Sequence, residues 1–147
     1  MPALCDVNLL LALCHGSHVH HARARQWAAG LGDHEAVLCR FTELALLRLS
    51  TTQTIFGLRV LTNHEAWALV DILLADPRFR FDDEPPEITV YLRRHSDVET
   101  PAPKRWQDAY LAAFAIAADL DFVTFDGGFR SFSGLRATVL TESTSSS

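Results

Sequence analysis

The chain has 147 residues, 48% of them hydrophobic and 21% charged, and it carries a formal net charge of −5. A chain of this length predicts a single domain that buries about two thirds of its surface around one core. The negative charge argues against a basic surface that coats DNA. A nucleic acid substrate stays possible if the acids gather at a metal site.

Neither a membrane span nor a signal peptide is predicted. The longest uncharged apolar run covers residues 7–14, far short of the ~20 residues that cross a bilayer. Asp6 lies where a signal peptide would be cationic. Cys5, Cys14 and Cys39 cannot all pair and lack C-x-x-C spacing, so we expect reduced thiols in a cytoplasmic protein.

Short apolar or β-branched runs alternate with longer helical patterns along the chain. In chain order, the pattern predicts a strand at 3–7 passing into a helix through 9–11, a helix at 18–31, a strand at 36–40 and a helix at 41–49. It continues with a helix at 63–76, a strand at 78–83, helices at 85–95 and 104–120, and strands at 121–126 and 137–140. The polar segment 141–147 is predicted to be a frayed, disordered tail, which leaves 1–140 as the domain.

The helix at 63–76 has a clear amphipathic pattern. Asn63 is its expected N-cap. Its apolar face is expected to consist of Trp67, Val70, Leu73 and Leu74.

Strands that alternate with helices at this spacing predict a parallel sheet with helices on both faces, an α/β/α sandwich. The carboxyl ends of parallel strands share one edge, where ligands bind. Asp6 and Asp126 lie at the exits of the first and fourth predicted strands, and Glu43 and Asp108 lie in the first turns of helices beginning at that edge. Each acid alone could simply cap a helix and complement its dipole, which would stabilise the helix by about 0.3–2 kcal/mol. Convergence of four acids from four elements predicts a functional site.

Nearby acids are expected to lie elsewhere. Asp119 is about 16 Å along the helix from Asp108, at ~1.5 Å per residue. Asp121 is about 16 Å along the strand from Asp126, at ~3.3 Å per residue. The acidic run 82–84 is expected to be a solvated loop.

Mutual repulsion indicates what the four acids hold. Two unit charges about 5 Å apart repel by ~3 kcal/mol at an effective dielectric near 20, whereas a whole domain has only ~5–15 kcal/mol of net stability. No lysine or arginine is placed by the pattern at the centre, so the cluster needs protons or a cation. Oxygen-only ligands suit Mg²⁺ or Mn²⁺. We therefore expect a divalent-metal site that activates water and neutralises a phosphate under attack.

Four segments resemble the PIN-domain family. They are "CDVNLLLAL" (a D-x-N opening), "CRFTELALLRL" (a strand-to-helix Glu element), "RWQDAYLAAFA" (a D-A-x-x-A-A helix) and "LDFVTFDGGF" (a T-x-D-x-x-F ending). They occur in this order over residues 3–132. The short chain is most similar to the VapC-type toxins of type II toxin–antitoxin pairs.

This resemblance implies a five-stranded parallel sheet and Mg²⁺- or Mn²⁺-dependent endoribonuclease activity. It also implies homodimerisation, and inhibition by a cognate VapB-type antitoxin whose C-terminal segment occupies the active-site groove. By the same resemblance, Asp6 and Asp108 would be the principal metal ligands and Glu43 and Asp126 would complete the catalytic acidic set. Asn8 and Thr124 match the accompanying polar positions, where they would orient ligands or the scissile phosphate.

Several cations flank the acids in sequence. Lys104, Arg105 and Arg40 are candidates for contacts with RNA phosphates at the rim of the site, and Arg48 occupies a similar position. The alternative is that these cations are solvated and have no special role.

Other residues suggest further functional sites, but a structural role is an alternative for each. Trp106 could stack on a base, but a core or dimer-contact role is expected. The apolar segment 44–61 could serve an interface or the core. His15, His18 and His21 suggest zinc, but a matching thiolate or carboxylate ligand is missing, so a solvated helix start is expected.

Two other function classes compete with the ribonuclease. A haloacid-dehalogenase-type phosphatase also begins with an Asp after its first strand, but it needs an acid where this chain has Asn8, and amides deliver no proton. A PIN-like module could bind nucleic acid or protein without cleaving. An inactive module would have no reason to keep four mutually repelling acids.

Overall fold

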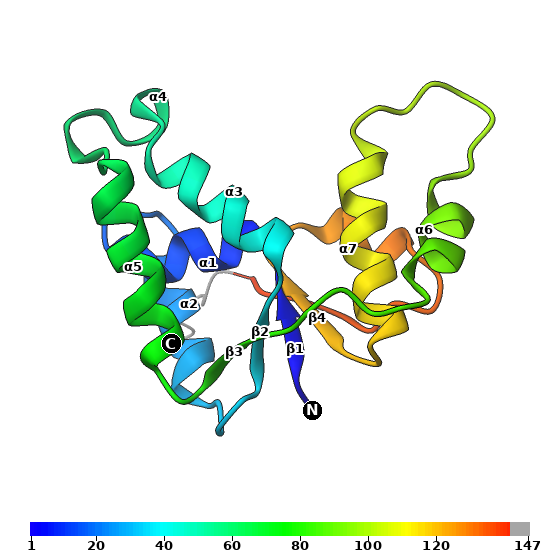
Figure 1. Cartoon of the computed structure of the whole chain (residues 1–147), viewed down its shortest axis with the longest axis horizontal. Helices are drawn as coiled ribbons and strands as arrows, with labels where there is room; N and C mark the ends of the chain where they lie inside the picture. The colour runs from blue at the N-terminus through cyan, green and yellow to red at the C-terminus, as the bar shows by residue number, and fades with distance from the viewer. Residues whose placement is uncertain (142–147) are drawn as a thin grey trace, which may run out of the picture.

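The computed structural model describes residues 1–141, and a five-stranded parallel sheet lies at its centre (Figure 1). The strands are β1 (Ala3–Cys5), β2 (Ala36–Leu38), β3 (Phe79–Phe81), β4 (Asp121–Thr124) and β5 (Ala137–Val139). Their order is β3-β2-β1-β4-β5, and each neighbouring pair is parallel. The predicted fold class is therefore confirmed. The predicted polar tail lies outside the described residues, apart from Thr141.

Helices connect the strands. They are α1 (Val7–Cys14), α2 (His21–Ala29), α3 (Arg40–Ser50), α4 (Gln53–Phe56), η1 (Gly57–Arg59), α5 (Asn63–Ala75), α6 (Ile88–Ser96), α7 (Arg105–Ala117) and η2 (Gly127–Ser131). The two short helices α4 and η1 were not predicted from the sequence. Among residues 1–141, none of these helices is long and apolar enough to cross a bilayer.

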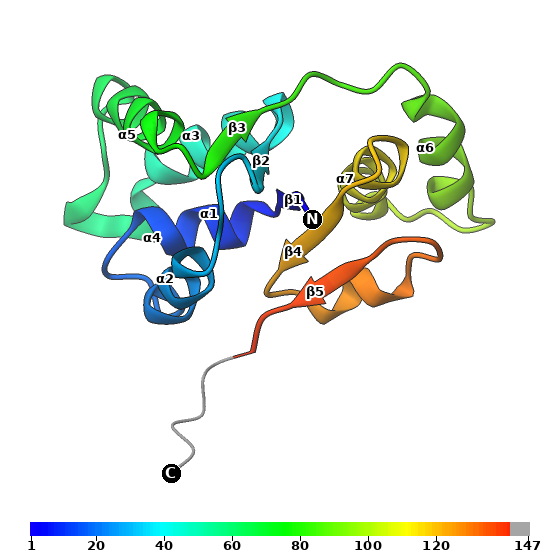
Figure 2. The same ribbon diagram turned by 90° about the horizontal axis from the view of Figure 1, so that it is seen from below.

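The sheet separates two hydrophobic cores, one on each face. Ala3 and Cys5 of β1 belong to the core that contains α1 and parts of α2, α3 and α5. Leu4, between them, belongs to the other core, with the buried face of α7. Successive side chains of a strand point to opposite faces, so one short strand serves both layers. Figure 2 shows α1 to α5 on one side of the sheet and α6 and α7 on the other.

Alanines bring α7 close to the sheet. Ala109, Ala112, Ala113 and Ala115 are fully buried beside Phe114. Because an alanine adds only a methyl group, the helix backbone can approach the strands closely. This packing positions the first turn of α7 at the carboxyl edge of the sheet.

The start of α5 differs from the prediction. The N-cap is Thr62 rather than Asn63, and it forms a capping box with Glu65: the Thr62 hydroxyl accepts from the Glu65 amide at 3.1 Å. A hydroxyl followed three residues later by a carboxylate satisfies two free amides, which Asn63 could not do from its position. Trp67, predicted to be on the apolar face, is 49% exposed, and Ala66 is buried instead.

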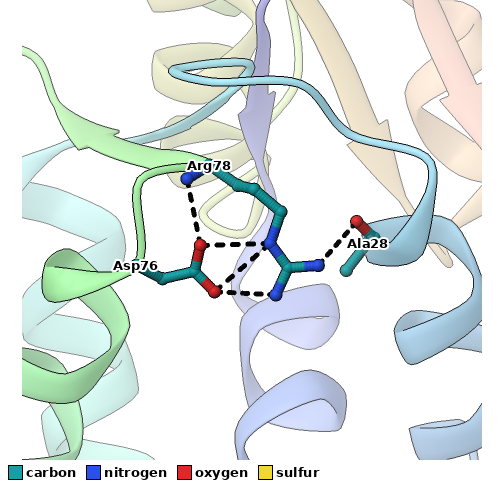
Figure 3. A network of polar contacts seen from close by, with 3 residues as sticks. All are labelled: Ala28, Asp76 and Arg78. Carbon is teal, nitrogen blue, oxygen red and sulfur yellow. Dashed lines mark hydrogen bonds and ion pairs between the residues drawn. The ribbon is translucent and has the colours of Figure 1, made fainter.

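One arginine ties the edge of the sheet to a distant helix (Figure 3). Arg78 precedes β3, and its guanidinium donates to Asp76 Oδ2 at 2.7 Å and to the carbonyl of Ala28 at 2.8 Å. A cation at the carboxyl end of α2 also complements the helix dipole. The contact links the turn after α5 to the end of α2.

Candidate active site at the carboxyl edge of the sheet

Asp6 lies where the central strand ends and α1 begins. It is 7% exposed and caps α1, because its Oδ1 accepts from the Val7 amide at 2.7 Å. Its Oδ2 accepts from the Thr124 hydroxyl at 2.6 Å. Both carboxylate oxygens thus accept hydrogen bonds from two different elements, and the side chain has little freedom to move.

Thr124 organises the middle of the site. Cys5 of β1 is in register with Val123 of β4, so the next residues of the two strands, Asp6 and Thr124, lie side by side. The fully buried Thr124 hydroxyl donates to Asp6 and accepts from the Asp126 amide at 2.9 Å. Asn8 completes the network, donating to Thr124 Oγ1 at 3.4 Å and accepting from the Phe125 amide at 3.3 Å.

Asp126 follows β4 and caps the short helix η2. Its Oδ1 accepts from the Gly128 amide at 2.8 Å. A Cβ at residue 128 would lie 3.1 Å from that same oxygen, which is tighter than most real contacts. Glycine at this position therefore lets the backbone amide approach the carboxylate.

The structure brings Asp6, Asp108 and Asp126 into electrostatic contact. Burial raises the pKa of Asp6 to about 6, its hydrogen bonds from Thr124 and Val7 oppose the rise, and the charges of Asp108 and Asp126 add to it. Burial and the charge of Asp126 also raise the pKa of Asp108, while Arg105 lowers it. Three of the four predicted acids thus come from three elements and destabilise each other's charge.

Glu43 has a different environment. It lies in the first turn of α3, is 4% exposed and forms an ion pair with Arg40, one turn before it. The Arg40 guanidinium also lies 4.9 Å from the centre of the Phe81 ring. No lysine or arginine was predicted at the centre of the four acids, but Arg40 pairs with Glu43 at its side, because one helical turn brings residues i and i+3 together.

A groove of about 630 Å³ runs beside the acids. Asp6, Asn8 and Asp108 form part of its polar lining. Its opposite wall is a stripe of α3: Phe41, Leu44, Ala45, Arg48 and Leu49. Leu44 is 56% exposed, and it was not predicted as a residue of this site. Helix α3 carries a second apolar stripe besides the one that packs on the core, and this pattern could have identified Leu44.

The donor chemistry of the site fits Mg²⁺ or Mn²⁺. Its carboxylate oxygens are hard ligands, and a cation would relieve the repulsion that raises the pKa of Asp6 and Asp108. Within residues 1–141, however, no group of three or more His, Cys, Asp or Glu side chains is arranged to hold a metal ion. The acids are gathered at one edge but not closed into a ligand cluster.

The predicted cationic residues have distinct environments. Lys104 is exposed. Arg105 is half-buried, donates to the carbonyl of His95 at 2.7 Å and lies 4.7 Å from the centre of the Phe132 ring. Arg105 therefore contributes to packing as well as charge. Trp106 is 61% exposed, so of its two expected roles the one in the core is wrong, and the dimer contact stays a prediction.

Two of the three histidines form hydrogen bonds with other helices. Helix α2 begins at His21, so His18 lies before the helix rather than at its predicted first residue. His15 Nε2 hydrogen-bonds Ser50 Oγ at 2.9 Å, and His21 Nδ1 hydrogen-bonds the carbonyl of Ala12 at 2.8 Å. These side chains are half-buried rather than solvated.

The acids at the far end of β4 have their own partner. Arg136 donates to Asp119 at 2.9 Å and to Asp121 at 2.7 Å. Asp121 is the first residue of β4, and Asp126 lies two residues beyond its last residue, Thr124. As predicted from the residue spacing along the helix and the strand, Asp119 and Asp121 lie at the opposite edge of the sheet.

Known proteins resemble this chain both in sequence and in fold. Residues 3–135 match the PIN domain family. Ribonuclease VapC41 of Mycobacterium tuberculosis is 39% identical over 142 residues, covering 93% of this chain and 97% of that protein. Ribonuclease VapC44 of the same species is 34% identical over 139 residues, covering 86% and 87%. The fold is similar to that of VapBC-1 from nontypeable Haemophilus influenzae, with a TM-score of 0.68, 14% identity, and coverage of 95% of this chain and 98% of that one.

Proposed function

Because this chain belongs to the PIN-domain family, and within it to the VapC ribonucleases, we propose that it is a divalent-metal-dependent endoribonuclease. Its biological role would be the toxin of a VapBC-type toxin–antitoxin pair. The reaction is hydrolysis of an RNA phosphodiester: the oxygen of water bonds to phosphorus, and the leaving ribose oxygen takes a proton.

The observation that carries this proposal is the electrostatic coupling of Asp6, Asp108 and Asp126. Three separate elements deliver these acids to one edge, and burial together with mutual repulsion raises the pKa of Asp6 to about 6. A fold gains nothing from such an arrangement by itself, because each buried charge costs stability. Binding of a cation and catalysis of phosphate hydrolysis give the arrangement a purpose.

The chain's own residues would divide the work. Asp6 is held at both oxygens by Thr124 and Val7, which favours it as the fixed ligand of the site. Asp108 and Asp126 would complete the set, and Asn8 and Thr124 would keep the acids oriented. Glu43 would join only after exchanging its ion pair with Arg40. A bound Mg²⁺ or Mn²⁺ would supply Lewis-acid stabilisation of the phosphate and a lowered pKa of bound water.

The experiment is an RNA cleavage assay with purified protein. Wild-type protein should cleave RNA with Mg²⁺ or Mn²⁺, and EDTA should stop it. Asp6→Asn and Asp108→Asn should lose cleavage while keeping the wild-type circular dichroism spectrum. The matched control is Asp71→Asn, which changes an exposed carboxylate on α5. Cleavage by Asp108→Asn at the wild-type rate would overturn the assigned roles.

We also propose a homodimer and a VapB-type antitoxin partner, both acting in the cytoplasm. The groove of about 630 Å³ offers the antitoxin's C-terminal segment an apolar wall on α3 that faces two acids, Asp6 and Asp108. A segment with an apolar side chain beside a cation would complement it. Leu58, fully exposed, and Ile55, 48% exposed, favour a dimer contact near α4 and η1. The free thiols Cys5, Cys14 and Cys39 are consistent with a reducing compartment.

The competing proposal, a PIN-like module that binds without cleaving, is not favoured. A module that only binds would not explain why Asp6, Asp108 and Asp126 lie close enough to repel one another. The same assay decides: RNA binding by the wild type without cleavage at millimolar Mg²⁺ or Mn²⁺ would favour the inactive module.

A further inference from the structure

A second groove lies outside the acidic site, between α6, the segment that follows it and the first turn of α7. Its volume is about 720 Å³. Its lining includes Leu92 and Arg93 of α6, Val98, Pro101 and Pro103 of the connecting segment, and Trp106 of α7. In Figure 1 this connecting segment arches above the start of α7, at the top right of the view.

The groove is built on a rigid junction. Arg105, next to Trp106, donates to the carbonyl of His95 at the end of α6 and lies over the Phe132 ring. Two prolines stiffen the connecting segment, because each fixes its own φ. A groove formed before the ligand arrives loses little conformational entropy on binding.

The exposure of Trp106 in this groove is not explained by packing of the fold. Its side chain is 61% exposed, although α7 otherwise buries a continuous apolar face. An indole ring beside aliphatic and proline side chains is a stacking platform for another flat ring. Every nucleobase has such a face, so stacking on an aromatic side chain needs no particular base sequence.

The groove itself is lined by one cation and one acid, Arg93 and Asp97, and the chain segment that forms it carries a small excess of positive charge. Residues 93–105 contain four of the chain's 13 Lys and Arg residues, namely Arg93, Arg94, Lys104 and Arg105, against two acids, Asp97 and Glu99. This segment is thus positive by two charges in a chain whose net charge is −5. Arg94 lies 5.5 Å from the centre of the Tyr91 ring, an arrangement that restrains its side chain.

The groove and the acidic site lie on opposite sides of one helical turn. Trp106 and Asp108 share the first turn of α7, ~3 Å apart along the axis and on opposite sides of the helix. We propose that this groove is a base-binding subsite, in which an RNA strand that crosses the first turn of α7 stacks an unpaired nucleobase on Trp106. The inference rests on the proposed ribonuclease function and extends it to substrates that are single-stranded at this position.

The test measures RNA binding in EDTA, so that cleavage does not interfere. One probe is a fluorescein-labelled oligoadenylate of twelve nucleotides, and the other is a base-free ribose phosphate chain of the same length. Trp106→Ala should weaken binding of the oligoadenylate by roughly 5- to 150-fold and leave the base-free chain unchanged. Trp106→Phe should keep most of the affinity. The matched control, Trp67→Ala, removes the half-exposed tryptophan of α5 and should change neither probe.

Each other outcome is decisive. Equal loss for both probes would mean that Trp106 acts through structure or charge, and it would overturn the inference. A loss of self-association in Trp106→Ala by sedimentation, with unchanged RNA affinity, would assign the groove to a second copy of the chain and also overturn it. If wild-type protein cleaves RNA with Mg²⁺ while Trp106→Ala binds normally, the ribonuclease proposal survives and only the subsite fails. Base-dependent binding without cleavage would leave the subsite and remove the ribonuclease.

Discussion

Substitution of Asp6 by asparagine should stabilise the metal-free protein, and the gain should depend on pH. The pKa of Asp6 rises from 3.8 to about 6 in the folded protein, mainly because the carboxyl is buried. A folded pKa above the unfolded value means that the native state holds the proton more tightly. The ionised form therefore destabilises the fold, with no cost well below pH 4 and the full cost above pH 6.

The magnitude follows from the size of the shift. About two pKa units correspond to ~3 kcal/mol. Linkage then predicts that ionised Asp6 costs ~3 kcal/mol at pH 8 but only ~0.6 kcal/mol at pH 4. Asparagine resembles the protonated carboxyl in shape and stays neutral at both pH values, so Asp6→Asn should remove this dependence.

Urea unfolding followed by circular dichroism, in EDTA at pH 8 and pH 4, measures the effect. Asp6→Asn should gain about 2.5 kcal/mol more at pH 8 than at pH 4. The control Asp71→Asn, on the exposed face of α5, should stay within about 0.5 kcal/mol of wild type at both pH values. An equal gain at the two pH values, or none at pH 8, would refute the electrostatic argument. Millimolar Mg²⁺ should raise the melting temperature of wild type and not of Asp6→Asn.

Two further substitutions probe the supports of the site and of the sheet. Thr124→Val removes the fully buried hydroxyl between Asp6 and the Asp126 amide, and it should lower the free energy of unfolding by about 1–3 kcal/mol. Because the Thr124 hydrogen bond lowers the pKa of Asp6, its loss should move the pH dependence of stability to higher pH, which urea unfolding across pH 4–8 measures. Arg78→Met, which keeps the aliphatic stem but loses the contacts to Asp76 and the Ala28 carbonyl, should cost about 1 kcal/mol at pH 7. Arg78 lowers the pKa of Asp76, so this loss should shrink below pH 4; an undiminished loss there would argue against the ion pair.

Local patterns were sufficient for most elements of the fold. The strand at the start of the chain and the long helix before β4 were predicted because their apolar residues recur with the strand and helix periods. The cap of α5 was misassigned by one residue, since Thr62 and Glu65 form a reciprocal pair that outcompetes Asn63. The short helices α4 and η1 lack a long periodic pattern, and the start of α2 was placed three residues too early.

The candidate site was predicted to a similar extent. The parallel-sheet rule directed Asp6, Asp108 and Asp126 to one edge, where the charges of Asp108 and Asp126 add to the raised pKa of Asp6. The hydrogen-bonding role of Thr124 depends on the register between β1 and β4, which sequence spacing does not specify. Likewise, the apolar groove wall formed by Leu44 depends on which side of α3 is left uncovered.

The sequence by itself determined the alternation of strands and helices, the parallel sheet and the set of acids at its carboxyl edge, because these follow from periodicity and chain connectivity. Tertiary structure alone decided that the Thr124 hydroxyl hydrogen-bonds Asp6 and that Trp106 is exposed beside a second groove. Side-chain partners and exposure depend on what packs against each face from distant parts of the chain, and no local pattern records that.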